Sequence, residues 1–277
     1  MSKVHEALQN KVAVVTGGSG VLCSEMAMEL ARQGMRVAIL NRTAQKGEAV
    51  VRSITENDGE AINFSVDVLN KESLIAARQA ILQQYGQIDV LINGAGGNHP
   101  DAITADEVYK EQSTTPNFFE LTPSGFESVF SNNFTGTFLA AQVFGEALLR
   151  TKGTIINISS MSSYAPMTKV PAYSAAKAAI NNFTQWMAVH FAEVGLRVNA
   201  IAPGFFITEQ NRNLLLTEDG SLTARSEKII TATPQKRFGK PQDLLGTLLF
   251  LADDTYSAFV TGVTIPVDGG FMAYSGV

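Results

Sequence analysis

The sequence has one cysteine, no long apolar run and no concentration of basic residues. With Cys23 alone it can form neither an intramolecular disulfide nor a thiolate cluster for zinc, and no closely spaced set of metal ligands replaces one. No stretch reaches the roughly 18 apolar residues of a membrane span, and the polar first ten residues do not resemble a signal peptide. Lys and Arg number 21 against 26 Asp and Glu. We therefore expect a soluble cytoplasmic protein without a metal, membrane or nucleic-acid partner.

Short apolar runs alternate with helix-length segments, a pattern typical of a parallel sheet covered by helices on both faces. In the first such segment, apolar residues recur at every fourth position, at Leu22, Met26 and Leu30, and Gly34 follows as an expected helix end. We expect one doubly wound α/β domain of Rossmann type over residues 1–277, with a seven-stranded, mostly parallel sheet. The expected strands are Val12–Val15, Val37–Leu40, Ile62–Val66, Val90–Asn93, Thr154–Ile158, Arg197–Ile201 and Val263–Val267.

Two stretches, 97–123 and 205–233, interrupt this alternation. Both are much longer than the roughly 2–6 residues usual for a connection in such folds. Long connections at the carboxyl ends of parallel strands form the ligand sites of open α/β sheets. We expect these two stretches to surround the substrate.

The first expected strand runs directly into a glycine-rich turn, Thr16-Gly17-Gly18-Ser19-Gly20, and Val21 and Leu22 then begin a helix. Glycines let backbone N–H groups approach a pyrophosphate at the positive end of a helix. A glycine-rich turn after a strand can also bind nothing. Its place at the first strand favours dinucleotide binding.

The end of the second strand, Asn41-Arg42, bears on the choice of cofactor. An acid that would accept hydrogen bonds from the adenosine ribose of NAD is missing there. Arg42 could pair with the 2′-phosphate of NADP, which leans the prediction toward NADP. A solvated arginine is the alternative, and NAD stays open.

A further motif places Ser160 after the fifth expected strand and Tyr173 and Lys177 four positions apart. On a helix, that spacing puts both side chains on one face, where an ammonium would favour the phenolate and lower the tyrosine pKa. Tyr173 could then act as acid and base, while the hydroxyl of Ser160 binds the substrate oxygen. A surface Tyr–Lys pair is the alternative. The combination with the glycine loop favours catalysis.

With these residues in place, the chain resembles the short-chain dehydrogenase/reductase family from about Lys11 to Gly270. The matching motifs are Thr16-Gly17, Asp67-Val68, Asn93-Gly94-Ala95-Gly96, Asn133-Phe134-Thr135-Gly136-Thr137, Pro203-Gly204 with Thr208, and Asp268-Gly269-Gly270. The family's cofactor loop, Thr-Gly-x-x-x-Gly-x-Gly, differs here because Val21 and Cys23 replace its last two glycines. We interpret Cys23 as a structural residue that packs helix against strand.

The resemblance implies that Asn133 completes a proton relay with Ser160, Tyr173 and Lys177, and that Lys177 also holds the nicotinamide ribose. It implies NAD or NADP as cofactor, and a homotetramer formed through the helices that hold Tyr173 and follow Pro123. The residues expected at the cofactor are Thr16, Gly17, Gly18, Ser19, Gly20, Val21, Leu22, Asn41, Arg42, Asp67, Val68, Asn93, Ala95, Gly96, Tyr173, Lys177, Pro203, Gly204, Phe206 and Thr208.

Three longer segments, 96–100, 205–212 and 270–277, resemble the D-mannonate oxidoreductase (fructuronate reductase) branch of that family. The reaction implied is reversible reduction of the ketone of D-fructuronate to D-mannonate. A sugar acid needs a cation for its carboxylate and polar groups for its hydroxyls. The candidate substrate residues are Asn98, His99, Met161, Lys169, Asn211 and Arg212, each of which could instead be an ordinary loop residue.

Two rival functions stay open. One is another reductase of the same family, such as a gluconate 5-dehydrogenase or a 3-oxoacyl reductase. The other is a dinucleotide-binding protein without turnover, which is disfavoured because all four relay residues are present.

Overall fold

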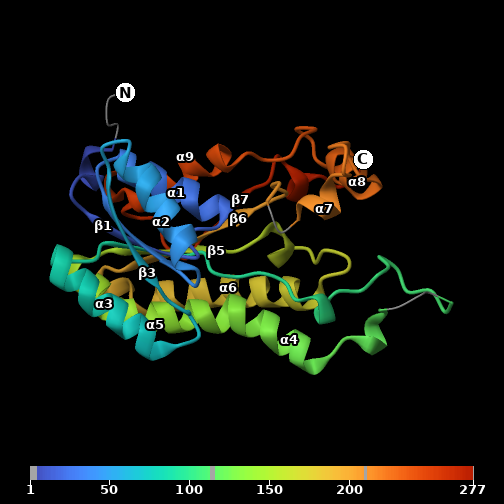
Figure 1. Ribbon diagram of the computed structural model, residues 1–277, viewed down its shortest axis with the longest axis horizontal. Coiled ribbons are helices and arrows are strands. Elements are labelled where there is room, and N and C mark those ends of the chain that lie inside the picture. Colours follow the sequence, from blue (N-terminus) through green and yellow to red (C-terminus); the bar gives the residue numbers. More distant parts are fainter. Residues whose placement is uncertain (1–4, 113–115, 209–210, 277) are drawn as a thin grey trace.

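The strands of this protein form a single seven-stranded sheet in the order β3-β2-β1-β4-β5-β6-β7, and every neighbouring pair is parallel. The computed structural model describes residues 5–112, 116–208 and 211–276 (Figure 1). The strands are β1 (Val12–Thr16), β2 (Arg36–Asn41), β3 (Glu60–Ser65), β4 (Val90–Asn93), β5 (Thr154–Ile158), β6 (Arg197–Pro203) and β7 (Thr264–Val267). The expected α/β fold and seven-stranded sheet are confirmed.

Helices cover both faces of the sheet. Figure 1 shows α1 (Val21–Arg32), α2 (Ala44–Thr55) and α9 (Leu245–Ala252) on one face. On the other lie α3 (Lys71–Tyr85), α5 (Gly136–Thr151) and α6 (Pro171–His190). Each face has its own apolar core, because the strands point alternate side chains to opposite sides. None of the helices in the described part of the chain is long and apolar enough to cross a membrane.

The sequence signals for helix ends act as expected in two places. Gly34, with φ +90°, follows the last turn of α1, and Gly86, with φ +79°, caps α3. Both glycines adopt the left-handed conformation that ends helices at little steric cost. The expected strand boundaries are correct to within two residues.

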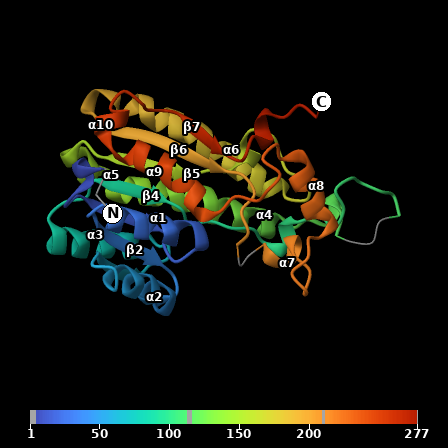
Figure 2. The same cartoon turned by 90° about the horizontal axis from the view of Figure 1, so that it is seen from above.

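The two long connections differ in structure. The first, between β4 and α4 (Pro123–Phe130), is irregular in its described residues, 94–112 and 116–122, apart from single turns at Pro100–Ala102 and Phe118–Glu120. The second, expected as a loop, contains α7 (Arg212–Leu215) and α8 (Ala224–Ala232). Figure 2 shows α8 above α4, on the same side of the molecule as the first connection.

The strand order reverses between β1 and β4, since β2 and β3 extend to one side of β1 and β5 to β7 lie beyond β4. At such a point the connections leave in opposite directions and a crevice opens at the carboxyl ends of the two strands. This crevice is where the glycine loop and the residues after β4 meet.

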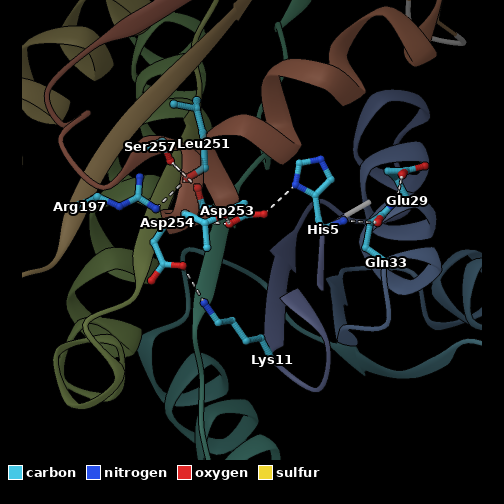
Figure 3. Close-up of polar contacts among 10 residues, drawn as sticks. His5, Lys11, Glu29, Gln33, Arg197, Leu251, Asp253, Asp254 and Ser257 are labelled. Carbon is cyan, nitrogen blue, oxygen red and sulfur yellow. Dashed lines mark hydrogen bonds and ion pairs between the residues drawn. The ribbon is translucent and has the colours of Figure 1, made fainter. Parts of the chain in front are cut away.

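Near the amino end of β1, an ion pair joins the start of the chain to the segment after α9 (Figure 3). His5 Nδ1 lies 2.8 Å from Asp253 Oδ2, whose side chain is only 1% exposed. Asp253 also caps α10 (Asp254–Ser257) by accepting a hydrogen bond from Thr255 N–H. Burial raises the pKa of Asp253, but the hydrogen bonds from Thr255 and His5 outweigh it and hold the pKa below 3.8.

We predict that Asp253→Asn lowers the free energy of unfolding by about 1–2 kcal/mol at pH 7, because a buried cap loses its charge. The pKa of Asp253 is depressed in the folded state, so its contribution is present above about pH 4 and is lost as the pH falls through the folded value. The difference in unfolding free energy between the parent and Asp253→Asn should therefore be smaller at acidic pH. Urea unfolding at pH 7 and about pH 3.5 measures both effects.

The matched control is Asp254→Asn, because Asp254 pairs with Lys11 at 3.3 Å but is 56% exposed. Its expected cost is below about 0.5 kcal/mol at either pH. Equal losses for the two variants would contradict the prediction.

Candidate active site

The glycine loop after β1 packs directly against the segment after β4. Gly17 has φ +64°, and a Cβ there would lie 2.9 Å from the backbone of Gly94 and Ala95. The hydroxyl of Thr16 donates to Ile92 O at 3.3 Å and accepts from Gly94 N–H at 3.1 Å. The loop therefore needs glycine for its backbone angle and for the close approach.

The residues at this crevice fit a dinucleotide. Gly20 is the N-cap of α1, so the unpaired amides of the first turn face the glycine loop. Gly20 and Gly96 are both exposed and offer bare backbone. A Cβ at Gly96 would lie 2.4 Å from Asn133 Oδ1 and 3.6 Å from Lys177 Nζ. An anionic group would meet positive backbone dipoles here, without a side chain in the way.

Cys23 is buried beneath the bare backbone of this crevice, which forms the floor of the site. It occupies the position where the family's loop has its last glycine. A Cβ on Gly94 would lie only 2.2 Å from Cys23 Sγ. The larger residue on α1 is thus accommodated by a glycine after β4. Burial raises the pKa of Cys23 to about 11, which suits the expected structural role and not a reactive thiolate.

Tyr173 and Lys177 lie on the first two turns of α6, where Pro171 occupies the first turn. Lys177 Nζ lies 5.5 Å from the centre of the Tyr173 ring and donates to Ile158 O at 2.8 Å. The lysine is 5% exposed. Its ammonium is thereby fixed between the end of β5 and the tyrosine, on the face that the four-residue spacing predicts.

Ser160 follows β5 and is 6% exposed. Its hydroxyl forms a hydrogen bond with that of Tyr173 and accepts another from Ser162 N–H at 3.2 Å. The structure therefore brings Ser160, Tyr173 and Lys177 together, as the sequence predicts. A carbonyl oxygen placed between the two hydroxyls would be within reach of both donors.

Asn133 lies in a π-helical turn, Ser131–Thr135, between α4 and α5, and is fully buried. Its amide donates to Gly97 O at 2.7 Å and to Val129 O at 2.8 Å, and its oxygen accepts from Gly97 N–H at 3.3 Å. Such single π turns often occur at functional sites. Asn133 therefore holds the segment after β4 against the turn between α4 and α5.

The ionisation of the pair differs from the expectation. Burial raises the pKa of Tyr173, and the hydrogen bond with Ser160 offsets this only partly. Burial also lowers the pKa of Lys177 to about 8. The expected lowering of the tyrosine pKa by the lysine is thus not what this structure shows, because desolvation disfavours both charged forms. At neutral pH Tyr173 is a protonated donor.

A second hydrogen-bond chain behind these residues was not evident from the sequence. Ser159 Oγ donates to Asn181 Oδ1 at 2.5 Å, Asn181 Nδ2 to Ser163 Oγ at 2.7 Å, and Ser163 Oγ to Ser160 O at 2.5 Å. Asn181 lies one turn after Lys177 on α6. This chain fixes Ser160 relative to the catalytic helix. Only the helical spacing from Lys177 to Asn181 could have suggested it.

The other expected cofactor residues divide into those with exposed side chains and those whose side chains or backbone groups are already buried or bonded. Asp67 and Arg42 are exposed at the ends of β3 and β2, where an adenosine moiety could reach them. Phe206 packs its side chain into the apolar core, so only its backbone is available. Asn41, Val68, Asn93 and Pro203 are buried, Gly204 would place a Cβ 2.6 Å from Asp268 Cα, and Thr208 N–H is bound to Asn211 Oδ1.

The expected substrate residues differ in how far their groups are already engaged. Asn211 caps its own loop, donating to Phe206 O at 2.8 Å, and His99 Nδ1 accepts from Asp101 N–H. Met161 is buried, and Asn98 and Arg212 are exposed. Of the six, Lys169 alone combines a half-buried cation with a place in the segment between Ser160 and Tyr173.

The family model for short chain dehydrogenases matches residues 11–219. The chain belongs to the short-chain dehydrogenase family. It is an oxidoreductase by that membership. It is 66% identical over its full length to UxuB, an uncharacterised oxidoreductase of Bacillus subtilis, which it also covers completely.

Two further relatives bear on what the enzyme does. A solved structure from Haemophilus influenza, named as a candidate D-mannonate oxidoreductase with bound NAD, has a TM-score of 0.94 at 48% identity, with 98% of each chain covered. A 3-oxoacyl-[acyl-carrier-protein] reductase of Synechocystis is 34% identical over 97% of this chain and 99% of its own. Neither gives support to the expected lean toward NADP.

We predict that Gly94→Ala destabilises the parent by about 1–3 kcal/mol, because the added methyl group overlaps Cys23 Sγ. In the Cys23→Ala background the same change should cost at least about 1 kcal/mol less, since the overlapping sulfur is gone. Urea unfolding of the parent, both single variants and the double variant measures this coupling. Strictly additive losses would show that the two positions are independent.

Proposed function

We propose that this protein catalyses the reversible reduction of the ketone of D-fructuronate to D-mannonate with NAD(H). The observation that carries the proposal is the arrangement of Tyr173, Ser160 and Lys177 beside the bare floor at Gly96. The likeness to the Haemophilus influenza structure, named as a candidate D-mannonate oxidoreductase, supports the choice of substrate.

A dinucleotide bound at the glycine loop would supply the hydride for reduction and accept it in oxidation. Tyr173 protonates the substrate oxygen from its hydroxyl as the alkoxide forms, a role that its raised pKa suits. Ser160 orients the same oxygen and shares its developing charge. Lys177, fixed by Ile158 O, stabilises the phenolate that remains after the proton has moved.

Asn133 keeps this arrangement aligned, since it binds both backbone groups of Gly97. We further propose that it holds a water in the path that returns a proton to Tyr173. The residues at the glycine loop, Thr16 to Leu22, would hold the pyrophosphate, and Lys177 would also bind the nicotinamide ribose.

We propose NAD(H) as the working cofactor, because the similar Haemophilus influenza structure contains NAD. Arg42 is exposed and leaves NADP(H) as the alternative. Initial rates with NADH and with NADPH distinguish the two. A faster reaction with NADPH would contradict the choice of NAD(H) and support the NADP(H) preference inferred from Arg42.

The substrate is tested by initial rates of NADH oxidation with D-fructuronate, a gluconate-type ketone and a 3-oxoacyl ester. Turnover that is fastest with D-fructuronate supports the proposal. Faster turnover with either control would mean that the protein is an oxidoreductase with a substrate other than D-fructuronate. The resemblance to a 3-oxoacyl reductase makes the third compound an informative control.

We predict that Tyr173→Phe lowers kcat by about 10²–10⁴-fold, because proton transfer to the substrate oxygen loses its donor. NADH binding, followed by the change in its fluorescence, should stay within about threefold of the parent. Parent-like turnover in this variant would refute the mechanism. Loss of NADH binding would instead indicate a damaged fold.

We also propose a homotetramer. Aromatic side chains on α5 and α6 lie in a row, in which Phe138 contacts Phe183, Phe183 stacks on Trp186, and Trp186 stacks on His190. Trp186 is 56% and Val189 81% exposed. Apolar surfaces of this kind on a folded chain mark protein interfaces.

We predict that Val189→Glu breaks the tetramer into smaller species, because a charge would be buried in an apolar interface. Light scattering coupled to gel filtration measures the mass of parent and variant. Val108→Glu is the control, since Val108 is 71% exposed on the first long connection, away from this surface. A monomeric parent would disprove the proposal.

A further inference from the structure

Lys169 has an unusual backbone for a lysine. It lies in the segment between Ser160 and Tyr173, and its φ of +72° places it in the left-handed region. Residues with a Cβ rarely adopt this conformation, and those that do cluster at functional sites. A glycine or asparagine would fit the backbone more easily. The lysine side chain itself is therefore the feature to explain.

The first long connection holds this residue in place. Lys169 O accepts a hydrogen bond from Thr104 N–H at 2.9 Å. Ala102, two residues earlier, is 1% exposed and packs with Ala172 at the start of α6, and Tyr173 packs against the same cluster. The connection thus contacts the catalytic helix and the strained lysine together.

The same connection is tied to α8 by charge. Glu107 lies 3.0 Å from Lys228 Nζ and 3.4 Å from Arg225 Nη1. Its pKa is lowered, first by the hydrogen bond from Lys228, and Lys169 adds to this through its charge. Glu107 is therefore paired with two cations, Lys228 and Arg225, and a third, Lys169, acts on it through its charge.

Lys169 is the cation of the three that is not committed to Glu107. Within the part of the chain that the structure describes, its ammonium forms no hydrogen bond or ion pair, whereas both other cations are paired. The side chain is half-buried. An ammonium that holds no hydrogen bond or ion pair of its own is available to bind an anion.

We propose that Lys169 binds the carboxylate of the substrate, so that the enzyme selects sugar acids over neutral ketoses. This rests on the function proposed above. The hydroxyls of Tyr173 and Ser160 bind the ketone oxygen, and Lys169 binds the acid group toward the other end of the sugar. The left-handed backbone and its hydrogen bond with Thr104 fix the point from which the lysine side chain leaves the main chain.

The other candidate groups are less suited. Arg212 is exposed on α7, and the amide of Asn211 is used within its own loop. His99 is 41% exposed and lies 3.9 Å from Asp101, a carboxylate that would repel the substrate. Lys169 is the candidate closest in sequence to Tyr173, four residues before it and just ahead of α6.

The test compares D-fructuronate with D-fructose, which has a hydroxymethyl group in place of the carboxylate. In Lys169→Asn the backbone conformation is retained and the charge is lost. We expect KM for D-fructuronate to rise roughly 10- to 100-fold, and the ratio of kcat/KM for the acid over the neutral sugar to fall by the same factor. Lys169→Arg, which keeps a cation, should recover most of that ratio.

Lys152→Asn is the matched control, because Lys152 is also left-handed, with φ +49°, but caps the end of α5 just before the amino end of β5. It should leave the acid-to-neutral ratio at the parent value. The melting temperatures of both asparagine variants should equal or exceed that of the parent, since asparagine relieves the backbone strain.

The outcomes separate the two proposals. If the parent reduces D-fructuronate and Lys169→Asn keeps the parent ratio, the inference about Lys169 is wrong and the function stands. If the parent does not reduce it, the function is wrong, and calorimetric binding of D-mannonate to the NAD complex decides the inference. If Lys169→Asn weakens D-mannonate binding and Lys152→Asn does not, the inference that Lys169 binds the carboxylate is supported. If the parent does not bind D-mannonate, that inference is overturned.

Discussion

The close approach of two backbone segments at the reversal of strand order is the constraint on which this structure depends. The turn after β1 and the segment after β4 touch at Gly17 and Gly94, where a Cβ would overlap neighbouring atoms, and a Cβ at Gly96 would overlap Asn133. The contact leaves a floor of backbone dipoles without side chains. Cys23 shows how narrow the tolerance is, because its sulfur takes the space that a Cβ at Gly94 would need.

A buried ammonium occupies the other side of this floor. Lys177 loses its hydration and gains one hydrogen bond to Ile158 O, and burial lowers its pKa to about 8. Burying an amine costs stability unless its surroundings compensate. The chain Ser159–Asn181–Ser163–Ser160 and the amide of Asn133 hold the surrounding backbone in place. The site thus combines an unfavourable buried charge with a rigid frame.

The walls of the site are built differently from its floor. Strands and long helices position Tyr173 and Lys177, whereas irregular segments position Lys169 and Glu107. Under the proposed function, the frame fixes the reacting groups and the connections decide which molecule reaches them. Ion pairs from Glu107 to α8 join the two long connections, which are far apart in the sequence.

The sequence by itself determined the class of fold, because apolar runs and glycine positions are local and periodic. It also determined the pairing of Tyr173 with Lys177, since helical spacing places them on one face. Three things depended on the tertiary structure: the raised pKa of Tyr173, the chain through Asn181, and the contacts of Lys169 with Thr104 and of Glu107 with α8. Desolvation and long-range contacts arise only when distant segments pack together, so no local pattern encodes them.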